Sequence, residues 1–125
     1  TGRPRLLLAY ADPAYASDCG RFFRRLGWEV QMVATGAEAV ELARFWKPTA
    51  VALAIDLPDE NGWSTSARVH AEHRDARIIL ITDCPDGADA MQAGRVGAET
   101  VIRRADGAEV LAQVLLGQAT FSQAV

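Results

Sequence analysis

The sequence contains almost no lysine, little cysteine and no long apolar run. Of its 13 basic residues, only Lys47 is lysine and the rest are arginine. Any reaction that requires a lysine side chain must therefore use Lys47. Two cysteines far apart in the sequence, Cys19 and Cys84, do not make a disulfide framework, which favours an intracellular chain. Because no segment approaches the roughly 18 apolar residues of a membrane span, we expect a cytoplasmic protein without a membrane partner.

Positive charge is not in excess, because the formal net charge is −3 and the pI is about 5.3. This balance excludes a generally basic surface of the kind that binds nucleic acid phosphates. The arginines at positions 21, 24 and 25 fit the solvated side of an amphipathic helix. The sequence contains no dinucleotide fingerprint, P-loop, nucleophile elbow or C-x-x-C motif. We therefore expect a protein that is not an enzyme and that binds no nucleic acid.

Short apolar runs alternate with helical patterns along the chain. Most of the runs are almost continuously hydrophobic, which is typical of strands buried on both faces of a parallel sheet. They lie at 6–11, 28–33, 50–55, 78–82 and 100–102. The intervening segments place apolar residues at helical spacing. The fourth of these predicted helices, at 86–93, is rich in alanine and has glycine near both ends.

Five strands alternating with five helices predict an α/β fold with a doubly wound, five-stranded parallel sheet. The favoured topology is flavodoxin-like, with strand order 2-1-3-4-5. One domain is predicted over residues 1–117, and 118–125 are predicted to be a C-terminal tail or the start of a linker. Ligands of such sheets bind outside the carboxyl ends of the strands. Candidate site residues therefore lie at 10–12, 33–35, 54–58, 82–84 and 103–106.

Six segments, taken in order, resemble the receiver domain of bacterial two-component response regulators. They are Asp12-Pro13 with Gly27–Val30, Ala34–Leu42, Lys47-Pro48, Leu57–Gly62, Ile78–Thr82 and Ala93–Ala98. The resemblance extends from residue 5 to about residue 117. It implies a domain that accepts a phosphoryl group on an aspartate at the end of the third strand. In the family, two acidic residues hold Mg²⁺, and a Thr or Ser and a Lys contact the phosphoryl oxygens.

The positions that carry this chemistry in the family hold different residues here, except for one hydroxyl. They are Ala54 for the phosphoacceptor, Tyr10 and Ala11 for the acidic pair, Arg104 for the lysine, Val101 for the switch aromatic and Thr82 for the switch hydroxyl. An alanine methyl cannot act as a nucleophile, and the lost carboxylates are the ligands that a hard cation prefers. The resemblance therefore implies a degenerate pseudo-receiver that lacks the phosphoacceptor aspartate. We expect no cofactor, no metal site and no Mg²⁺ binding, and His70 and His73, which lack a third ligand, are interpreted as surface residues.

Three aspartates lie near the predicted site, at Asp12, Asp56 and Asp83. Asp12 and Asp56 could form a displaced acidic site, but we favour Asp12 as a helix cap and Asp56 as a solvated loop residue. Asp83 stands beside Thr82, where it would repel a phosphoryl group. A guanidinium at Arg104 would seek one of these carboxylates, and we hypothesise that this ion pair fixes the site in one state. The alternative is an exposed arginine whose surface ion pairs contribute little.

These residues predict an atypical, phosphorylation-independent receiver domain that acts in bacterial signal transduction as a protein interaction or dimerisation module. Its partner would be a signalling protein or an effector domain, or a second copy of this chain. The family commonly uses the surface of the fourth helix, fifth strand and fifth helix for such contacts. One alternative is a ligand-sensing pseudo-receiver that holds a small anion or metabolite in the vacated pocket. Another is residual phosphoacceptor activity at Asp56 or Asp12.

Overall fold

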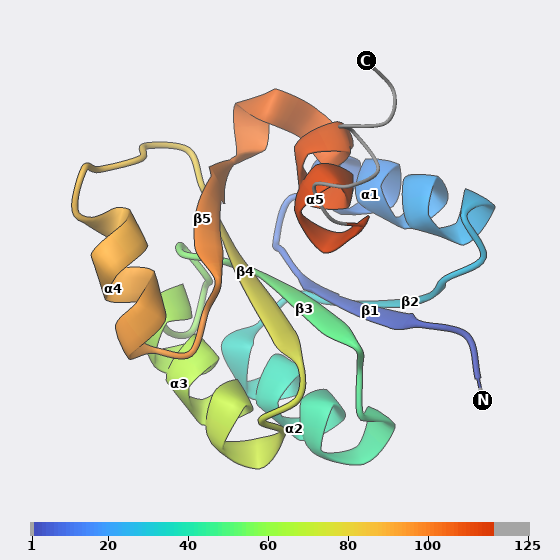
Figure 1. The fold of residues 1–125 in the computed structure, drawn as a ribbon, viewed down its shortest axis with the longest axis horizontal. Coiled ribbons are helices and arrows are strands. Elements are labelled where there is room, and N and C mark those ends of the chain that lie inside the picture. The colour runs from blue at the N-terminus through green and yellow to red at the C-terminus, as the bar shows by residue number, and fades with distance from the viewer. Residues whose placement is uncertain (1, 117–125) are drawn as a thin grey trace.

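The computed structural model describes residues 2–116, which form a five-stranded parallel sheet with helices on both faces (Figure 1). The strand order is β2-β1-β3-β4-β5, which confirms the predicted flavodoxin-like α/β fold. The strands are β1 (Arg5–Ala9), β2 (Glu29–Val33), β3 (Ala50–Ala54), β4 (Arg77–Thr82) and β5 (Thr100–Arg103). The helices are α1 (Pro13–Arg25), α2 (Gly36–Trp46), α3 (Gly62–Glu72), α4 (Asp89–Arg95) and α5 (Gly107–Leu116), with a 3₁₀ turn at Arg104–Asp106. Within the described residues, no helix has the length and apolar character needed to cross a membrane, and the predicted tail at 118–125 lies outside them.

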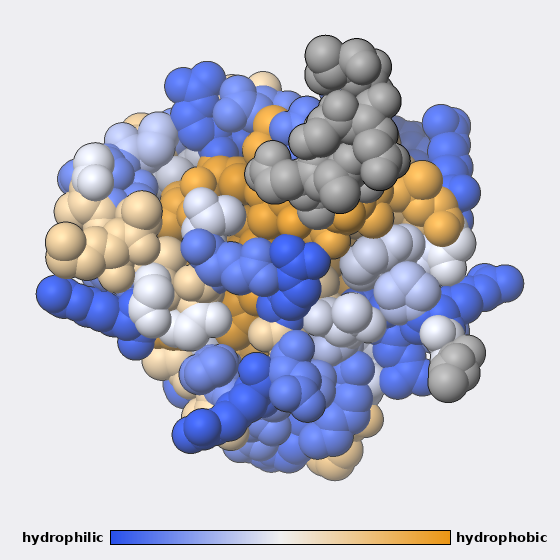
Figure 2. Space-filling view, viewed as in Figure 1, coloured by the Kyte–Doolittle hydropathy of each residue, from blue (hydrophilic) through white to orange (hydrophobic). Residues whose placement is uncertain are grey.

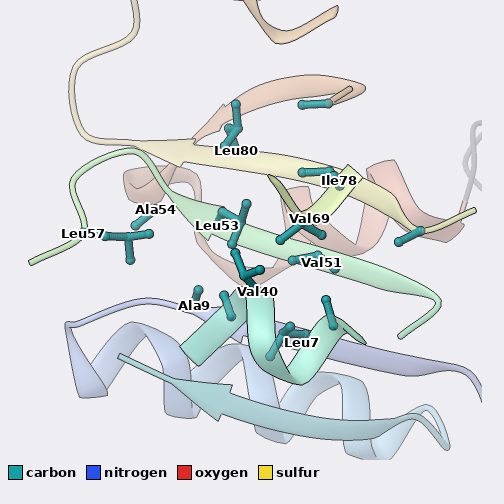
Figure 3. Packing of buried hydrophobic residues seen from close by; sticks show 14 of the residues in the cluster. Leu7, Ala9, Val40, Val51, Leu53, Ala54, Leu57, Val69, Ile78 and Leu80 are labelled. Carbon is teal, nitrogen blue, oxygen red and sulfur yellow. The ribbon is translucent and has the colours of Figure 1, made fainter. Parts of the chain in front are cut away.

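The core has two layers, one on each face of the sheet, because the side chains of successive residues in a strand point to opposite faces. Leu7 of β1 faces the layer built with α2 and α3, whereas Leu6 faces the layer built with α1 and α5. Figure 3 shows the first layer, in which Val40 of α2 and Val69 of α3 pack against the sheet. Every residue of β3 is buried. The central strand is therefore covered on both faces, as its continuous apolar run predicts.

The strand register brings the carboxyl ends of the three central strands to one level. Ala9 of β1 pairs with Leu53 of β3, and Ala54 of β3 pairs with Ile81 of β4. The segments that follow these strands therefore leave the sheet side by side. This edge is where an open parallel sheet places its ligand site.

Local sequence fixes where three of the helices begin. Asp12 is the N-cap of α1, and its Oδ1 accepts a hydrogen bond from the amide of Ala14 at 3.0 Å. Thr35 caps α2 by accepting a hydrogen bond from the amide of Glu38, whose carboxylate reaches back to the segment before the helix. Asn61 caps α3 in the same way. The favoured interpretation of Asp12 as a helix cap is thus confirmed.

The fourth helix begins later than the predicted range of 86–93. Asp86 forms a turn in which its Oδ1 accepts a hydrogen bond from the amide of Ala88 at 3.0 Å, and its own amide donates to Oδ2 of Asp89 at 2.7 Å. Such side-chain bonds to the backbone compete with helix formation. The helix that follows has no side-chain cap and buries only Ala93. Of the described helices, α4 is therefore the most weakly anchored.

Arg77, at the start of β4, fastens the end of α5 to the sheet. Its Nη1 donates to the carbonyl oxygen of Leu115 at 2.7 Å, and its Nη2 donates to that of Val114 at 2.9 Å. The same guanidinium binds both carboxylate oxygens of Glu99, at 2.5 and 3.0 Å. Arg77 therefore ties the last described turn of α5 to the start of β4 through two main-chain carbonyls.

Candidate functional site

A cavity of about 240 Å³ opens at the carboxyl ends of the strands. It is formed by the segments that follow β1, β3, β4 and β5, so it lies where the fold places a ligand site. Its lining consists of Tyr10, Ala11, Asp12, Ala54, Asp56, Ile81, Thr82, Asp83 and Arg104. The structure therefore brings together the residues predicted for the phosphoryl site and the three nearby aspartates, with the exception of Val101, whereas the candidate segment 33–35 contributes no residue to the lining. Val101 lies on β5, half-buried against the core.

Ala54, the last residue of β3, contributes a methyl group to the cavity wall. Its side chain is 5% exposed and belongs to the same core layer as Leu57 (Figure 3). The backbone around it is tightly packed, because the amide of Gly62 donates to the carbonyl oxygen of Ile55 at 2.7 Å. A Cβ at Gly62 would collide with the carbonyl oxygen of Ala54. Position 54 is thus rigidly placed and carries no side-chain nucleophile.

Tyr10 and Thr82 bring hydroxyl groups to the cavity. The Tyr10 ring packs against Tyr15 with the ring centroids 4.7 Å apart. Burial, and secondly the carboxylate of Asp83, raise the pKa of Tyr10 to about 12, so the phenol stays protonated at neutral pH. Thr82 is 8% exposed, and its Oγ1 accepts a hydrogen bond from the amide of Cys84 at 3.1 Å. The retained threonine hydroxyl therefore stabilises the loop that follows β4.

Arg104 joins two of the three predicted aspartates. Its Nε donates to Oδ1 of Asp83 at 2.5 Å, and its Nη1 donates to Oδ2 of Asp12 at 3.4 Å. The hydrogen bond to Asp83 raises the pKa of the Arg104 guanidinium above its ordinary value. Asp12 uses its other carboxylate oxygen to cap α1. The predicted ion pair is therefore present, and it forms with Asp83 and Asp12.

Negative charge predominates around the cavity, where the carboxylates of Asp12, Asp56 and Asp83 face the single guanidinium of Arg104. Asp56 makes no side-chain hydrogen bond or ion pair with another residue of the described range. Within residues 2–116, no group of three His, Cys, Asp or Glu side chains is placed to hold a metal ion. The arrangement is therefore suited to holding its own arginine, and a small anion entering it would meet repulsion.

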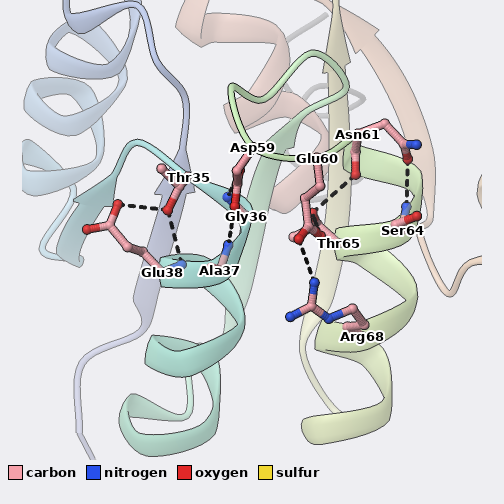
Figure 4. Close-up of polar contacts among 10 residues, drawn as sticks. All are labelled: Thr35, Gly36, Ala37, Glu38, Asp59, Glu60, Asn61, Ser64, Thr65 and Arg68. Carbon is pink, nitrogen blue, oxygen red and sulfur yellow. Dashed lines mark hydrogen bonds and ion pairs between the residues drawn. The ribbon is translucent and has the colours of Figure 1, made fainter.

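The loop between β3 and α3 is fastened to both neighbouring helices (Figure 4). Asp59 accepts hydrogen bonds from the amides of Gly36 and of the next residue, at 2.8 and 3.0 Å, at the N-terminus of α2. These backbone hydrogen bonds lower the pKa of Asp59 below its usual value. Glu60 accepts a hydrogen bond from the hydroxyl of Thr65 at 2.5 Å and forms an ion pair with Arg68 at 2.5 Å. The segment that follows Ala54 is thus held in one place.

Sequence reasoning missed Asp59, and it placed the two histidines wrongly. Asp59 lies within the resembling segment Leu57–Gly62, but its contact with Gly36 spans 23 residues and leaves no local pattern.

His70 and His73 are half-buried, which corrects the expectation of surface residues. His73 Nε2 lies 3.0 Å from the carbonyl oxygen of Pro48, and His70 Nδ1 is buried without a hydrogen-bond partner in the described part of the chain.

Several solved response regulators share this fold. A response regulator protein from Burkholderia pseudomallei, solved with a phosphorylated aspartic acid, a calcium ion and citrate, is 26% identical with a TM-score of 0.84. That match covers 97% of this chain and 71% of the other. A CheY-like receiver domain protein from Methanospirillum hungatei JF-1 is 19% identical with a TM-score of 0.84, over 91% of each chain. The BeF₃-activated receiver domain of Klebsiella pneumoniae RstA is 21% identical with a TM-score of 0.79, over 90% of this chain and 96% of the other.

Comparison with curated proteins gave no match. The family model described as the response regulator receiver domain matches residues 6–115, which is nearly all of the described chain. The order of the strands and the place of the cavity agree with that match. The chain therefore belongs to the response regulator receiver domain family.

Proposed function

We propose that this receiver domain is a non-enzymatic interaction or dimerisation module of two-component signalling that works without phosphorylation. The observation that carries the proposal is the methyl group of Ala54 in the cavity wall, where the family resemblance places the phosphoacceptor aspartate. Tyr10 and Ala11 stand where the resemblance places the two metal-binding carboxylates. The Burkholderia pseudomallei relative, in contrast, was solved with a phosphorylated aspartic acid and a calcium ion.

The residues of the cavity do not fit the Mg²⁺ ion that the family uses. Mg²⁺ requires oxygen ligands in nearly ideal octahedral geometry and is usually bound through one or two carboxylates. The phenol of Tyr10 stays protonated, and Ala11 has no side-chain ligand. The carboxylate of Asp12 is already engaged by the α1 backbone and by Arg104. Metal-assisted phosphoryl transfer is therefore no part of the proposed function.

Incubation with a small-molecule phosphodonor and Mg²⁺, followed by measurement of the intact mass, tests this proposal. We expect the mass of the protein to stay unchanged. Asp56 is the second candidate acceptor, because it lines the cavity with a carboxylate that is unpaired within the described range. A phosphoryl adduct that disappears in Asp56→Asn, and persists in the matched control Asp75→Asn at an exposed position, would overturn the proposal.

The surface of α4, β5 and α5 is the proposed contact region. Figure 2 views the molecule from the side of β5 and shows hydrophobic residues gathered between α4 and α5. Met91 of α4 is 68% exposed, and Val101, Val110 and Val114 are half-buried. A groove of about 290 Å³ runs along α4 and is lined by Ala88, Met91, Gln92, Arg95 and Val96. Apolar side chains that gather at the surface of one face are typical of protein contact sites.

Sedimentation over a range of protein concentrations tests whether the occupant of this surface is a second copy of the chain. Met91→Asp should weaken self-association at least about tenfold, because it places a charge on the most exposed large apolar side chain of the proposed region. Phe45→Asp is the matched control, since Phe45 is 73% exposed but lies on α2, outside the proposed region. Equal effects of the two variants would contradict the assignment of the surface. A wild-type chain that stays monomeric would refute dimerisation and leave a signalling protein or an effector domain as the partner.

A small anion or metabolite in the cavity is a weaker alternative. Arg104, the one cation among the described residues that line the cavity, already binds Asp83 and Asp12. An incoming anion would have to break these contacts in the presence of three carboxylates. We expect no thermal stabilisation by a panel of nucleotides and small anions. A ligand that raises the melting temperature of the wild type, and not that of Arg104→Gln, would favour the ligand-sensing alternative.

A further inference from the structure

We infer that Arg104, Asp83 and Asp12 form a clasp that holds the loop between β4 and α4 and thereby sets the position of α4. The biological purpose of the clasp rests on the proposed function, because α4 belongs to the proposed contact surface. The clasp itself is a property of the free chain and can be measured without a partner.

The clasp connects three segments that are far apart in the sequence. Arg104 follows β5, Asp83 follows β4 and Asp12 follows β1, so the contacts span 21 and 92 residues. The two arms come from different nitrogens of one guanidinium and reach two different carboxylates. A lysine ammonium presents all three of its donors from one nitrogen, so it cannot reach two carboxylates from two separated atoms as this guanidinium does. The arrangement therefore depends on arginine, which is the residue present here in place of the family's lysine.

The two ends of α4 are held in different ways. At its C-terminal end, the hydroxyl of Ser66 donates to the carbonyl oxygen of Val96 at 2.8 Å, and Ala93 is buried against the core. Its N-terminal end has no side-chain cap, and the loop at 83–88 is exposed at every position. The bonds between Asp86 and Asp89 join this loop to α4. At its other end, the loop is tied to the sheet by the Asp83 ion pair with Arg104 and the bond from Cys84 to the Thr82 hydroxyl. The placement of the N-terminal end of α4 thus depends on the clasp.

This geometry gives the loop one arrangement in the unmodified chain. An ordinary receiver couples the loop after its fourth strand to a phosphoryl group through a Thr or Ser and a Lys. Here the hydroxyl of Thr82 accepts a bond from its own loop, and the cation of Arg104 binds a carboxylate of that loop. The ion pairs are partly exposed, so salt should weaken the clasp. The contact surface would then be presented without any modification, for as long as the clasp is closed.

Hydrogen–deuterium exchange measured by mass spectrometry on the whole chain tests the clasp. Arg104→Gln, Arg104→Lys and Asp83→Asn should each speed the exchange of amides at 83–95 at least about fivefold, because the opening of this region becomes easier. Asp12→Asn should have a smaller effect there and leave α1 protected, since asparagine is as good an N-cap as aspartate. Arg103→Gln is the matched control, because Arg103 forms a local ion pair with Asp106 at similar exposure. Exchange at 83–95 that is unchanged in Arg104→Gln would overturn the clasp, and so would an equal acceleration in Arg103→Gln.

Sedimentation of the same variants separates this inference from the proposed function. Faster exchange at 83–95 together with weaker self-association supports both the clasp and its control of the α4 surface. Faster exchange with unchanged association keeps the clasp and overturns its control of the surface. A wild-type chain that is always monomeric refutes the proposed dimer, whereas the exchange result stands independently of it.

Discussion

Replacement of Arg77 by methionine should loosen the end of α5 by an amount that the structure allows us to estimate. The change removes two hydrogen bonds to the carbonyls of Val114 and Leu115 and the paired contact with Glu99. Hydrogen bonds to a charged group are worth about 1.5–3 kcal/mol and exposed ion pairs about 0–1 kcal/mol. Because the Arg77 side chain is 39% exposed, we assign the low end of this range, about 1.5 kcal/mol, to the two carbonyl bonds together. The expected loss of unfolding free energy is about 2 kcal/mol.

Urea denaturation followed by tryptophan fluorescence, together with a thermal melt, measures this loss. For a domain of this size, about 2 kcal/mol corresponds to a fall in melting temperature of roughly 8 °C. Glu99→Gln leaves the carbonyl bonds in place and should cost only about 0.5 kcal/mol. Arg74→Met, at an exposed position, should stay within about 0.5 kcal/mol of the wild type. The reasoning is refuted if Glu99→Gln is as destabilising as Arg77→Met, or if Arg77→Met matches Arg74→Met.

Three further outcomes are expected. The pKa of Asp59 is lower in the folded chain than in the unfolded chain, so its carboxylate contributes stability above its unfolded pKa of about 3.9. That contribution is lost as the pH falls through the folded pKa. Asp59→Asn should therefore flatten the dependence of unfolding free energy on pH in acid. The difference in unfolding free energy between wild type and variant should therefore shrink in acid, and a constant difference would contradict this cause. In an ultraviolet pH titration, Tyr10 should ionise near pH 12, and a midpoint near the ordinary value of about 10 would rule out its burial. Gly62→Ala should cost about 1–3 kcal/mol, because its methyl collides with the carbonyl oxygen of Ala54, whereas Gly87→Ala meets open space and should be nearly neutral in a denaturation assay.

The sheet and the place of the site could be predicted from the sequence because both depend on short-range patterns. The run Ala50–Ala54 is apolar at every position, and a strand with this pattern lies at the centre of a covered parallel sheet. Asp12-Pro13 is a helix start that acts through the next two residues. The carboxyl ends of parallel strands lie at one edge of the sheet independently of the conformation of the loops, so Ala54 and Thr82 both line the cavity at that edge.

The remaining features depend on contacts between distant segments or on competition within a turn. Asp86 lies in a segment whose composition suits a helix, yet its carboxylate bonds to the amide of Ala88 and forms a turn instead. The hypothesis that Arg104 pairs with an aspartate was correct, but the choice of Asp83 and Asp12 over Asp56 is set by the paths of three loops. No pattern in one segment carries that information.

Lys47 is the single site in this sequence at which a lysine side chain can be chemically modified. It is the only lysine in the sequence, it is exposed, and it follows α2 with a left-handed backbone (φ 54°) just before β3 begins. The cavity opens at the other end of the same strand, beside Ala54. A fluorophore, a biotin or an acetyl group attached to this side chain therefore sits at the amino end of the sheet. Such a label reports on binding, or immobilises the domain, while the opposite end stays free.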